Sequence, residues 1–394
     1  MKVLHWYRSM DLEMGGVVRA VLDISGAMAD RGHEQVIATF EQAELESMWT
    51  SHGANRSVLE LTSSGHRRRP LAGESLQRIE AEIGNCDAVH LHGVWDPACY
   101  QLAGIAERAG VPYLVSPHGV LDDWCMKQKS FKKRLYLAMG CRRMLNKAKA
   151  VHCTAEGERQ QATRWFNPDR ARVVPLVFDL DEYRVLPGPE EAHDAFPSLF
   201  EGPPVLLFLS RIHVKKGLEH LVAAAAELHA RGESVRVAIA GTGDLDYVER
   251  LKEQVASCGM EEVVHFIGFV SGTRKVSLYQ ASDLFVLPTH QENWGFVLLE
   301  SLACQTGLVT TKSVDIWPEL EASGGAVIVE RSAKSLADAQ QRRPHPARRD
   351  AQSVADQHGV ETIVVPHLEH APRHQRQCLN GRREAVASSA AEMF

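Results

Sequence analysis

Two stretches of this chain alternate short strand-like runs with longer segments of helical period. The first begins with KVLHWY over residues 2–7, and residues 16–32 follow with the period of an amphipathic helix. Such alternation is typical of βαβ units, in which a helix connects two parallel strands. The other runs that we predict as strands are EQVIATF, SVLELTS, DAVHLHG, PYLVSPHG, AVHCTA and ARVVPLV in the first half, and PVLLFLS, VRVAIAG, VVHFIGF, DLFVLP and GAVIVE in the second. The sequence therefore predicts an α/β fold with two mostly parallel sheets.

The two alternating stretches are separated by residues 186–204, where prolines, glycines and acidic residues gather and the period disappears. We therefore predict a first domain over residues 1–185, a linker over 186–204 and a second domain over 205–339. The length of 394 residues agrees with two domains, because a single core rarely serves more than about 300 residues. Two doubly wound, Rossmann-like sheets in tandem are expected to face a cleft with the carboxyl ends of their strands.

Residues 340–394 differ in composition from the rest of the chain. Arg, His, Gln and Pro are frequent there, and apart from ETIVVPHL no apolar run is visible. Two interpretations of this atypical tail stay open: a solvated, disordered segment, or translation in a shifted frame of GC-rich DNA. Composition alone does not separate them.

Composition and cysteine spacing exclude several classes of protein. The formal net charge of -6 shows no basic excess, which disfavours a nucleic-acid binder. The eight cysteines form no CxxC pair and the histidines form no HExxH motif, so we predict reduced thiols and no metal site. Neither a cleavable signal nor a run of about 20 apolar residues is present in the sequence, so the expected location is the cytoplasm.

Arg211 and Lys216, two of the cations in FLSRIHVKKGLEH, indicate an anion-binding loop. A strand ends near Ser210, Arg211 and Lys216 follow it, and Gly217 opens a helix. Side-chain charge, free helix amides and the helix dipole have one sign there, so together they attract a diphosphate. The alternative is a pair of solvated loop charges, but the position at the carboxyl end of a strand favours binding.

The stretch HQENWGFVLLESLA places two glutamates on either side of a boundary between loop and helix. Glu292 lies in the loop after DLFVLP, and Glu300 lies one turn inside the next helix. A loop carboxylate can accept hydrogen bonds from vicinal hydroxyls, and a helix carboxylate can accept them from the two hydroxyls of a ribose. The backbone amides expected to face a phosphate are those of Asn293, Trp294, Gly295 and Phe296. A structural role is favoured for each glutamate alone, but not for the pair combined with Arg211 and Lys216.

SRIHVKKG followed further along the chain by ENWGFVLLESLA resembles the retaining glycosyltransferases of the GT-B fold, family 4, the glycosyl transferases group 1. Three motifs of the first domain agree with this resemblance: the pair Gly15 and Gly16, the sequence GHE at residues 32–34, and SPHGVLDDW at residues 116–124. The resemblance covers roughly residues 2–339. It implies a GT-B fold, in which two Rossmann-like domains face a cleft.

The family pattern also implies roles for single residues. Arg211 and Lys216 would hold the diphosphate of a nucleotide sugar, Glu300 the ribose and Glu292 the hydroxyls of the transferred sugar. We assign Glu292 to the catalytic centre on this basis.

In the first domain, Gly15 and Gly16 fall in the family's first turn between strand and helix. A glycine at position 16 would let the backbone approach the distal phosphate, where a larger side chain would obstruct it. His118 matches the cleft histidine of the family, which is expected to lie near the reacting carbon, and we assign it to the catalytic centre. A purely structural histidine before a glycine is the alternative.

The resemblance implies a retaining hexosyltransferase that moves a hexose from a UDP- or GDP-sugar to an acceptor hydroxyl. Fixed cations and helix amides would stabilise the charge that develops on the leaving diphosphate, so we expect no metal and no cofactor. The expected acceptor is an oligosaccharide or a lipid-linked sugar at the cytoplasmic face of the cell membrane, as in polysaccharide or glycolipid biosynthesis.

Two departures from the family pattern keep alternatives open. Gln305 stands where the family has a glycine, and we expect it to adopt a positive φ at a cost of about 1 kcal/mol. The C-terminal helix of the family is not recognisable after Gln340, so a catalytically impaired sugar-nucleotide-binding protein remains an alternative. A GT-B sugar-nucleotide epimerase is a second alternative, whereas the incomplete glycine pattern in MDLEMGGVV argues against a dehydrogenase.

Residues 124–155 form a basic run without an acidic residue. Its cations are Lys127, Lys129, Lys132, Lys133, Arg134, Arg142, Arg143, Lys147 and Lys149. The apolar residues between them are Phe131, Leu135, Tyr136, Leu137, Met139 and Leu145. We predict a helix with one basic and one apolar side, as in a face that binds a membrane surface or an anionic acceptor. A core-packed helix with a solvated basic side is the alternative.

Overall fold

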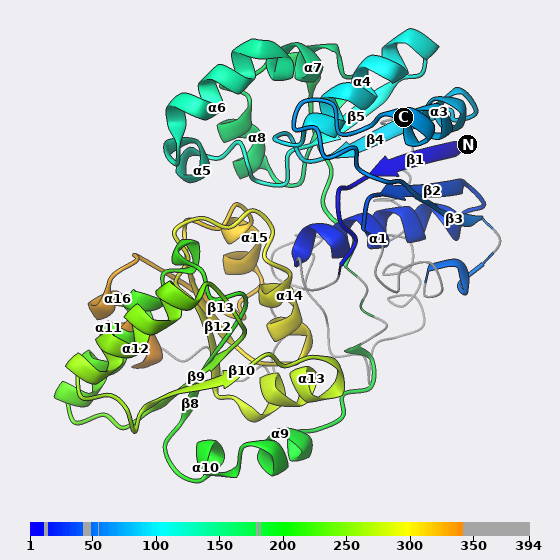
Figure 1. Ribbon diagram of the computed structural model, residues 1–394. Helices are drawn as coiled ribbons and strands as arrows, with labels where there is room; N and C mark the ends of the chain where they lie inside the picture. The colour runs from blue at the N-terminus through cyan, green and yellow to red at the C-terminus, as the bar shows by residue number, and fades with distance from the viewer. Residues whose placement is uncertain (12–14, 42–48, 54, 179, 181–182, 342–394) are drawn as a thin grey trace. The chain divides into compact units, whose positions relative to one another are not determined.

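The computed structural model describes residues 1–11, 15–41, 49–53, 55–178, 180 and 183–341. These residues form two compact units that divide after Phe178 (Figure 1). Almost all of the predicted tail, residues 342–394, lies outside the described residues, and so do residues 12–14 before Gly15.

The first unit contains a parallel sheet in the order β3-β2-β1-β4-β5-β6-β7 among the described residues. Its strands are β1 (Lys2–Trp6), β2 (Glu34–Thr39), β3 (Arg56–Glu60), β4 (Ala88–His92), β5 (Tyr113–Ser116), β6 (Ala150–Cys153) and β7 (Ala171–Val173). Its helices are α1 (Gly16–Ala29), α3 (Gly73–Gly84), α4 (Pro97–Ala109), α5 (Asp123–Lys127), α6 (Ser130–Tyr136), α7 (Arg142–Lys147) and α8 (Glu156–Ala162). Each of the strands predicted in this half of the chain is present.

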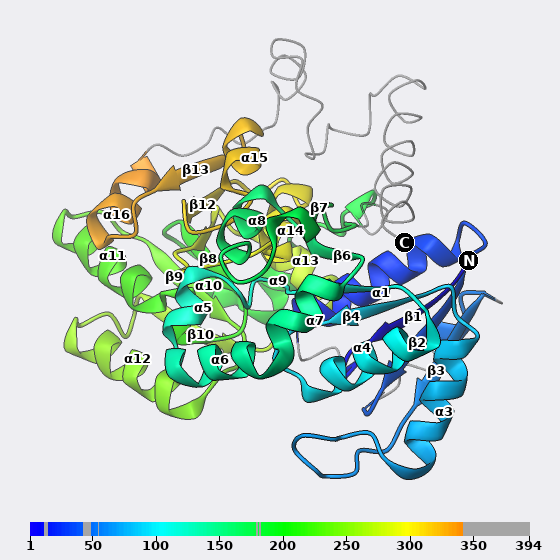
Figure 2. The same ribbon diagram turned by 90° about the horizontal axis from the view of Figure 1, so that it is seen from above.

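The two faces of this sheet have different side chains, because successive residues of a strand point to opposite faces. On one face Leu4, Val89 and Val151 belong to the main apolar core together with residues of α3 and α4. On the other face α1 places Ile24 against apolar residues of β5 and β6, Leu114 among them. Figure 2 shows α1 on one side of the sheet and α3 and α4 on the other.

The second unit contains a parallel sheet in the order β10-β9-β8-β11-β12-β13. Its strands are β8 (Val205–Leu209), β9 (Arg236–Ala240), β10 (Val264–Gly268), β11 (Leu284–Leu287), β12 (Leu308–Thr311) and β13 (Ala326–Val329). Its helices are α9 (Glu190–Ala195), α10 (Pro197–Phe200), α11 (Leu218–Ala230), α12 (Leu245–Ser257), α13 (Gly272–Ala281), α14 (Phe296–Ala303), α15 (Trp317–Ala322) and α16 (Ala333–Gln341). Strand β12 was not predicted, because its run LVTT has only two apolar residues.

The segment predicted as a linker, residues 186–204, carries the two short helices α9 and α10. The amide of Ala192 in α9 donates a hydrogen bond to the hydroxyl of Ser277 in α13 at 2.9 Å. Both helices belong to the second unit. The predicted boundaries of the linker and of the two domains stay predictions.

The single helix predicted in the basic run is wrong, because the run carries α5, α6 and α7 and ends in β6. Helices α6 and α7 are joined by one π-helical turn, Leu137–Cys141, in which Gly140 has a φ of 142°. A Cβ at Gly140 would lie 2.7 Å from the ring of Tyr100 in α4, so only glycine fits. None of the helices among the described residues is long and apolar enough to cross a bilayer.

Helix α14 ends with the positive φ that we expected at Gln305, where φ is 65°. The amide of Gln305 donates to the carbonyl of Leu302 at 3.0 Å, and the amide of Thr306 donates to the carbonyl of Ser301 at 2.9 Å. This pair of bonds is the Schellman motif, which usually has glycine at the left-handed residue.

We therefore expect Gln305→Gly to stabilise the protein by about 0.5–1 kcal/mol, because glycine adopts this conformation without a clash at Cβ. Chemical denaturation followed by circular dichroism would measure the change. Gln305→Ala is the matched control, since it keeps the Cβ and should bring no gain. Equal stability of the glycine and alanine variants would show that the positive φ at residue 305 causes no strain.

Candidate active site

The loop after β8 is held tightly against the loop after β9. The amide of Ile212 donates to the carbonyl of Thr242 at 2.7 Å. A Cβ at Gly243 would lie 1.9 Å from the carbonyl oxygen of Ile212, and one at Gly241 would lie 2.0 Å from that of Ser210. The absence of a side chain at both glycines thus lets the loop after β9 approach the backbone of the loop after β8. This packing fixes the loop that presents the exposed Arg211.

The same loop continues into the one turn of 3₁₀ helix, Val214–Lys216, that precedes α11. Gly217 follows with a φ of 68°, and a Cβ there would lie 2.2 Å from the carbonyl oxygen of Pro288. The carbonyl of Lys215 accepts a hydrogen bond from the amide of His290 at 2.8 Å. The loops after β8 and β11 therefore lie side by side at the carboxyl edge of the sheet.

This arrangement brings two of the predicted residues together, because the ammonium group of Lys216 forms an ion pair with the carboxylate of Glu292. Only 13% of the Lys216 side chain and 18% of the Glu292 side chain is exposed. Burial by itself would raise the pKa of Glu292, but the charges of Lys216 and Lys215 outweigh it and hold that pKa below its usual value. Glu292 is therefore ionised at neutral pH.

The backbone of Glu292 is fixed from a third loop. Its amide donates to the carbonyl of Ser313 at 2.8 Å, and its carbonyl accepts from the amide of Asp315 at 2.9 Å. These two bonds join the loop after β11 to the loop after β12. The carboxylate is thus held by its backbone as well as by Lys216.

Helix α14 begins four residues after Glu292, at Phe296. Gly295 caps it with a φ of 71°, and a Cβ there would lie 2.8 Å from Leu298. Asn293 and Trp294 are 8% and 4% exposed, so both side chains are buried. A hydrogen bond from the backbone of Asn293 helps to lower the pKa of Glu292, and the amide of Leu298 donates to the carbonyl of Gly295 at 2.8 Å. That amides of this segment face a phosphate stays a prediction.

Glu300 lies one turn into α14 and is held by two residues of α13. Lys275 donates to one carboxylate oxygen at 2.8 Å, and the hydroxyl of Tyr279 donates to the other at 3.1 Å. Sequence reasoning missed both partners. Their spacing of four residues, which places them on one helix face, is the signal that could have found them.

The predicted residues of the first unit lie at the carboxyl edge of its own sheet. Gly15 caps α1 with a φ of 96°, and Gly16 is the first residue of that helix and is exposed. His118 follows β5 with a φ of 51°, which is unusual for a residue other than glycine. Its ring contacts His92, Nε2 of His118 lying 2.9 Å from Nδ1 of His92. Burial lowers the pKa of His118 to about 3, so its imidazole is neutral.

Two groups of side chains among the described residues could hold a metal ion. One is His5, His90 and His92 in the first unit, and the other is Glu219, His220 and His290 in the second. In the second group, the carboxylate of Glu219 accepts from His290 at 2.9 Å and is therefore already engaged. The absence of a metal requirement stays a prediction.

Two glycosyltransferase family models match this chain, one in each half. Residues 190–342 match the family of glycosyl transferases group 1, and residues 15–176 match the glycosyl transferase 4-like domain. The chain is a group 1 glycosyltransferase of the GT-B fold.

Curated relatives of this glycosyltransferase include two D-inositol 3-phosphate glycosyltransferases. The enzyme of Catenulispora acidiphila is 27% identical over 332 residues, which cover 76% of this chain and 74% of the relative. The enzyme of Nocardia farcinica is 29% identical over 252 residues, which cover 60% of this chain and 54% of the relative. The chain thus spans only about half the length of the second relative.

Solved structures confirm the predicted fold of this glycosyltransferase. HepE of Anabaena, solved with UDP-glucose, superposes with a TM-score of 0.73 at 19% identity, covering 100% of both chains. Sucrose-phosphate synthase of Thermosynechococcus elongatus gives a TM-score of 0.72 at 18% identity, covering 100% of this chain and 98% of its own. At these identities the likeness shows the fold alone.

The Lys216–Glu292 pair gives a stability prediction for this glycosyltransferase. Lys216→Met leaves the carboxylate of Glu292 buried without its cation, so we expect a loss of about 2–4 kcal/mol in the free energy of unfolding. The double variant Lys216→Met/Glu292→Gln should recover part of the loss, because no buried charge remains. Denaturant unfolding of the single and double variants measures both values.

The matched control is Lys252→Met, which breaks the exposed ion pair between Lys252 and Glu249. Exposed pairs contribute at most about 1 kcal/mol, so this variant should lose far less stability than Lys216→Met. Equal losses in the two lysine variants would mean that the Lys216–Glu292 pair is an ordinary surface pair.

Proposed function

We propose that this glycosyltransferase moves a hexose from a UDP- or GDP-sugar to an acceptor hydroxyl with retention of the anomeric configuration. The observation that carries the proposal is the nearly buried Lys216–Glu292 ion pair beside the start of α14. Solved structures support the donor class, since HepE of Anabaena was solved in complex with UDP and in complex with UDP-glucose.

The proposed donor exchanges the partners of this ion pair. A phosphate oxygen takes the place of the Glu292 carboxylate at Lys216, so the cation stays paired while Glu292 becomes free to accept hydrogen bonds from sugar hydroxyls. Arg211 and the first amides of α14 provide further donors to the diphosphate. Glu300 exchanges Lys275 or Tyr279 for the ribose hydroxyls in the same way.

In the reaction, the bond between the anomeric carbon and the phosphate oxygen breaks, and its electron pair stays with the phosphate. Lys216 and Arg211 stabilise the negative charge that forms there. The acceptor oxygen forms the new bond on the face that the phosphate leaves, and the phosphate takes the acceptor's proton. No step needs a protein base or a metal ion.

Calorimetric titration with UDP and GDP tests the binding site. Lys216→Met and Glu300→Gln should each weaken nucleotide binding about 10- to 100-fold, because each removes a charged hydrogen-bond partner. Glu300→Gln keeps the shape of the side chain, and circular dichroism would show that both variants remain folded. Lys252→Met is the control and should bind as the wild type does. Unchanged affinity in both site variants would refute the site.

Incubation with UDP-glucose or GDP-mannose, followed by analysis of the products, separates this proposal from the impaired binder and the epimerase. A transferase hydrolyses or transfers its nucleotide sugar and releases the nucleoside diphosphate. A protein that binds donor without releasing the diphosphate fits the impaired binder, and one that converts the sugar without an acceptor fits the epimerase.

We also propose that the basic run docks on an anionic membrane surface, where a lipid-linked acceptor would lie. Phe131, Leu135 and Met139 follow each other at intervals of four residues and are 79%, 49% and 57% exposed. Core packing accounts for Leu137 and Leu145, which are buried, but not for these three. Exposed cations flank them, including Lys132, Arg134 and Arg142. An apolar row between cations is the pattern that binds anionic lipid interfaces.

Flotation with vesicles that contain phosphatidylglycerol tests this docking. We expect binding at low salt, weaker binding at 0.5 M salt, and a loss of at least tenfold in the variant Phe131→Ser/Leu135→Ser. Leu245→Ser, which removes an equally exposed leucine from the second unit, should bind as the wild type does. Binding that is indifferent to salt and to the double substitution would exclude a membrane role for this face.

A further inference from the structure

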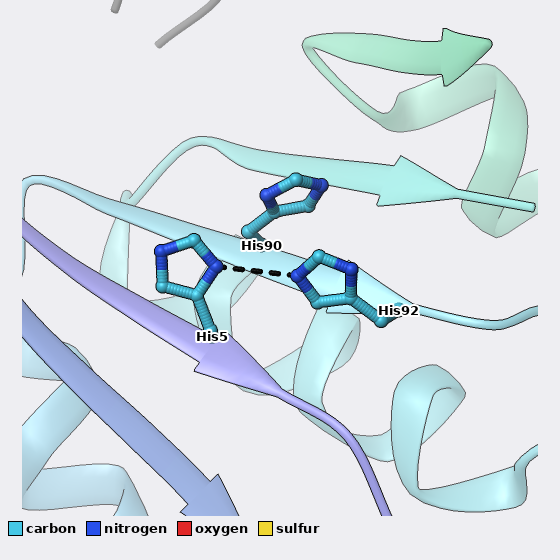
Figure 3. A group of neighbouring side chains, drawn as sticks. All are labelled: His5, His90 and His92. Carbon is cyan, nitrogen blue, oxygen red and sulfur yellow. Dashed lines mark hydrogen bonds between the residues drawn. The ribbon is translucent and has the colours of Figure 1, made fainter. Parts of the chain in front are cut away.

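Several histidines lie on one face of the first sheet, where strands of a parallel sheet usually carry apolar residues. His5 stands in β1, His90 and His92 in β4, and His152 in β6. All four are at most 2% exposed. Figure 3 shows His5, His90 and His92 with their rings gathered between β1 and β4. The donor site proposed above uses none of them.

One chain of hydrogen bonds begins at Gln35 of β2. The amide nitrogen of Gln35 donates to the carbonyl of Glu34 at 2.9 Å, which turns its oxygen toward His5. That oxygen lies 2.9 Å from Nε2 of His5. Because a side-chain amide oxygen can only accept, the proton of neutral His5 is on Nε2 and its Nδ1 carries a lone pair.

The constraint passes from ring to ring. Nδ1 of His5 lies 3.2 Å from Nε2 of His92, so His92 donates from Nε2 and its Nδ1 is the acceptor (Figure 3). Nδ1 of His92 lies 2.9 Å from Nε2 of His118, so His118 also donates from Nε2. Nδ1 of His118 is then left without a proton.

A second chain on the same face has the same polarity. Nε2 of His152 lies 2.7 Å from the carbonyl oxygen of Val174, which can only accept. Nδ1 of His152 therefore accepts from the hydroxyl of Ser116 at 2.9 Å, and that hydroxyl accepts from Nε2 of His90 at 2.7 Å. Backbone and amide oxygens thus fix the proton positions at the buried end of both chains.

Both chains hold neutral rings, which keeps the proton positions defined. Burial lowers the pKa of His5 to about 4 and that of His118 to about 3, and it places the pKa of His92 well below its usual value. An additional proton, which would allow either ring nitrogen to donate, is therefore disfavoured at neutral pH.

In the series of hydrogen-bonded side chains that begins at Gln35, only His118 is partly exposed. His118 has a φ of 51°. The amide of the next residue, Gly119, donates to the buried carboxylate of Glu158 at 2.7 Å, and this bond holds the turn in place. The chain therefore ends at a fixed ring that a ligand can reach.

We propose that Gln35, through His5 and His92, sets the tautomer of His118 so that its Nδ1 accepts a hydrogen bond from a hydroxyl of a bound sugar. Gln35, His5 and His92 are positioning residues. The inference rests on the proposed function for the identity of the ligand, whereas the tautomer is a property of the protein alone. A ring with Nδ1 unprotonated favours a hydroxyl and repels a carboxylate at that point of the sugar.

A divalent cation between His5, His90 and His92 is the competing arrangement, since their ligand atoms lie within 4.8 Å of one another. It would take the lone pairs of His5 and His92, so His92 would donate from Nδ1 and the tautomer of His118 would be reversed. No carboxylate belongs to this group, so two positive charges would be buried without an anion. The hydrogen-bonded arrangement avoids that cost.

The test is a long-range ¹H–¹⁵N spectrum of the uniformly labelled wild-type protein at pH 7 without donor, together with its metal content. We expect Nε2 to be the protonated nitrogen in His5, His92 and His118, and we expect no stoichiometric zinc, nickel or copper. A spectrum with Nδ1 protonated in His118, or a bound metal ion, would overturn the inference.

Gln35→Met removes the start of the chain while keeping the length of the side chain. We expect His118 to become a mixture of tautomers in this variant. Gln101→Met is the matched control, because Gln101 makes two hydrogen bonds to the backbone of Leu71 in the same unit and has no contact with the histidines. A purely structural effect would alter both variants alike, and that result would contradict the positioning role.

Titration separates this inference from the proposed function. Gln35→Met should weaken binding of the nucleotide sugar about 3- to 10-fold, as expected for a lost neutral hydrogen bond, and leave binding of the nucleoside diphosphate unchanged. UDP with UDP-glucose, and GDP with GDP-mannose, are the probe pairs. If the wild type binds none of them, the proposed function fails. If it binds them and the ratio within each pair is unaffected by Gln35→Met, only the positioning role fails.

Discussion

The site in the second unit depends on one ion pair, between Lys216 and Glu292. Nearly buried charges are costly to desolvate, and a pair of this kind is weak support for stability compared with apolar packing. The surrounding loops nevertheless hold it in place, since Gly217 fits only as glycine and the Glu292 backbone is bonded to two neighbouring residues of another loop. In the proposed reaction, this desolvated and paired ammonium group would accept a phosphate without rearrangement of the backbone. The charge that develops on the leaving group would then meet a cation that is already in position.

Much of the fold could be predicted from the sequence because its signals are local. Apolar runs identify the strands, glycines 217 and 295 mark the starts of α11 and α14, and Gln305 adopts the positive φ that its place after a helix requires. Glu292 and Lys216 could be placed near each other because both follow strands of one parallel sheet. The helices α9 and α10 were missed, since helices of a few residues are stabilised by tertiary packing and not by their own period. At Gly140, a Cβ would meet the ring of Tyr100 in another helix, a contact that the local sequence does not reveal.

The histidine chains could not be predicted because they depend on strand register. HLH in β4 reads as an ordinary buried strand, and only the pairing of His5 with His90 across β1 and β4 places their rings together. The same holds for Ser116 and His152, which stand on neighbouring strands β5 and β6. Lys275 and Tyr279 were missed for a similar reason, because their contact with Glu300 depends on the packing of α13 against α14. Sequence patterns identify elements, whereas the partners of polar side chains come from their assembly.

The two faces of the first sheet show what these histidines cost. Leu4, Val89 and Leu91 fill one face with apolar side chains, and the residues between them on the same strands could have been valine or isoleucine at a gain in hydrophobic burial. Imidazoles there must instead be desolvated, and a buried ring nitrogen without a hydrogen bond costs about 1–3 kcal/mol. Polar side chains that replace apolar ones in a core lower its stability, and proteins accept such a loss mostly at functional sites. These hydrogen bonds run from the amide of Gln35 to the partly exposed ring of His118. In the inference above, the loss of apolar burial therefore serves to fix the tautomer of His118.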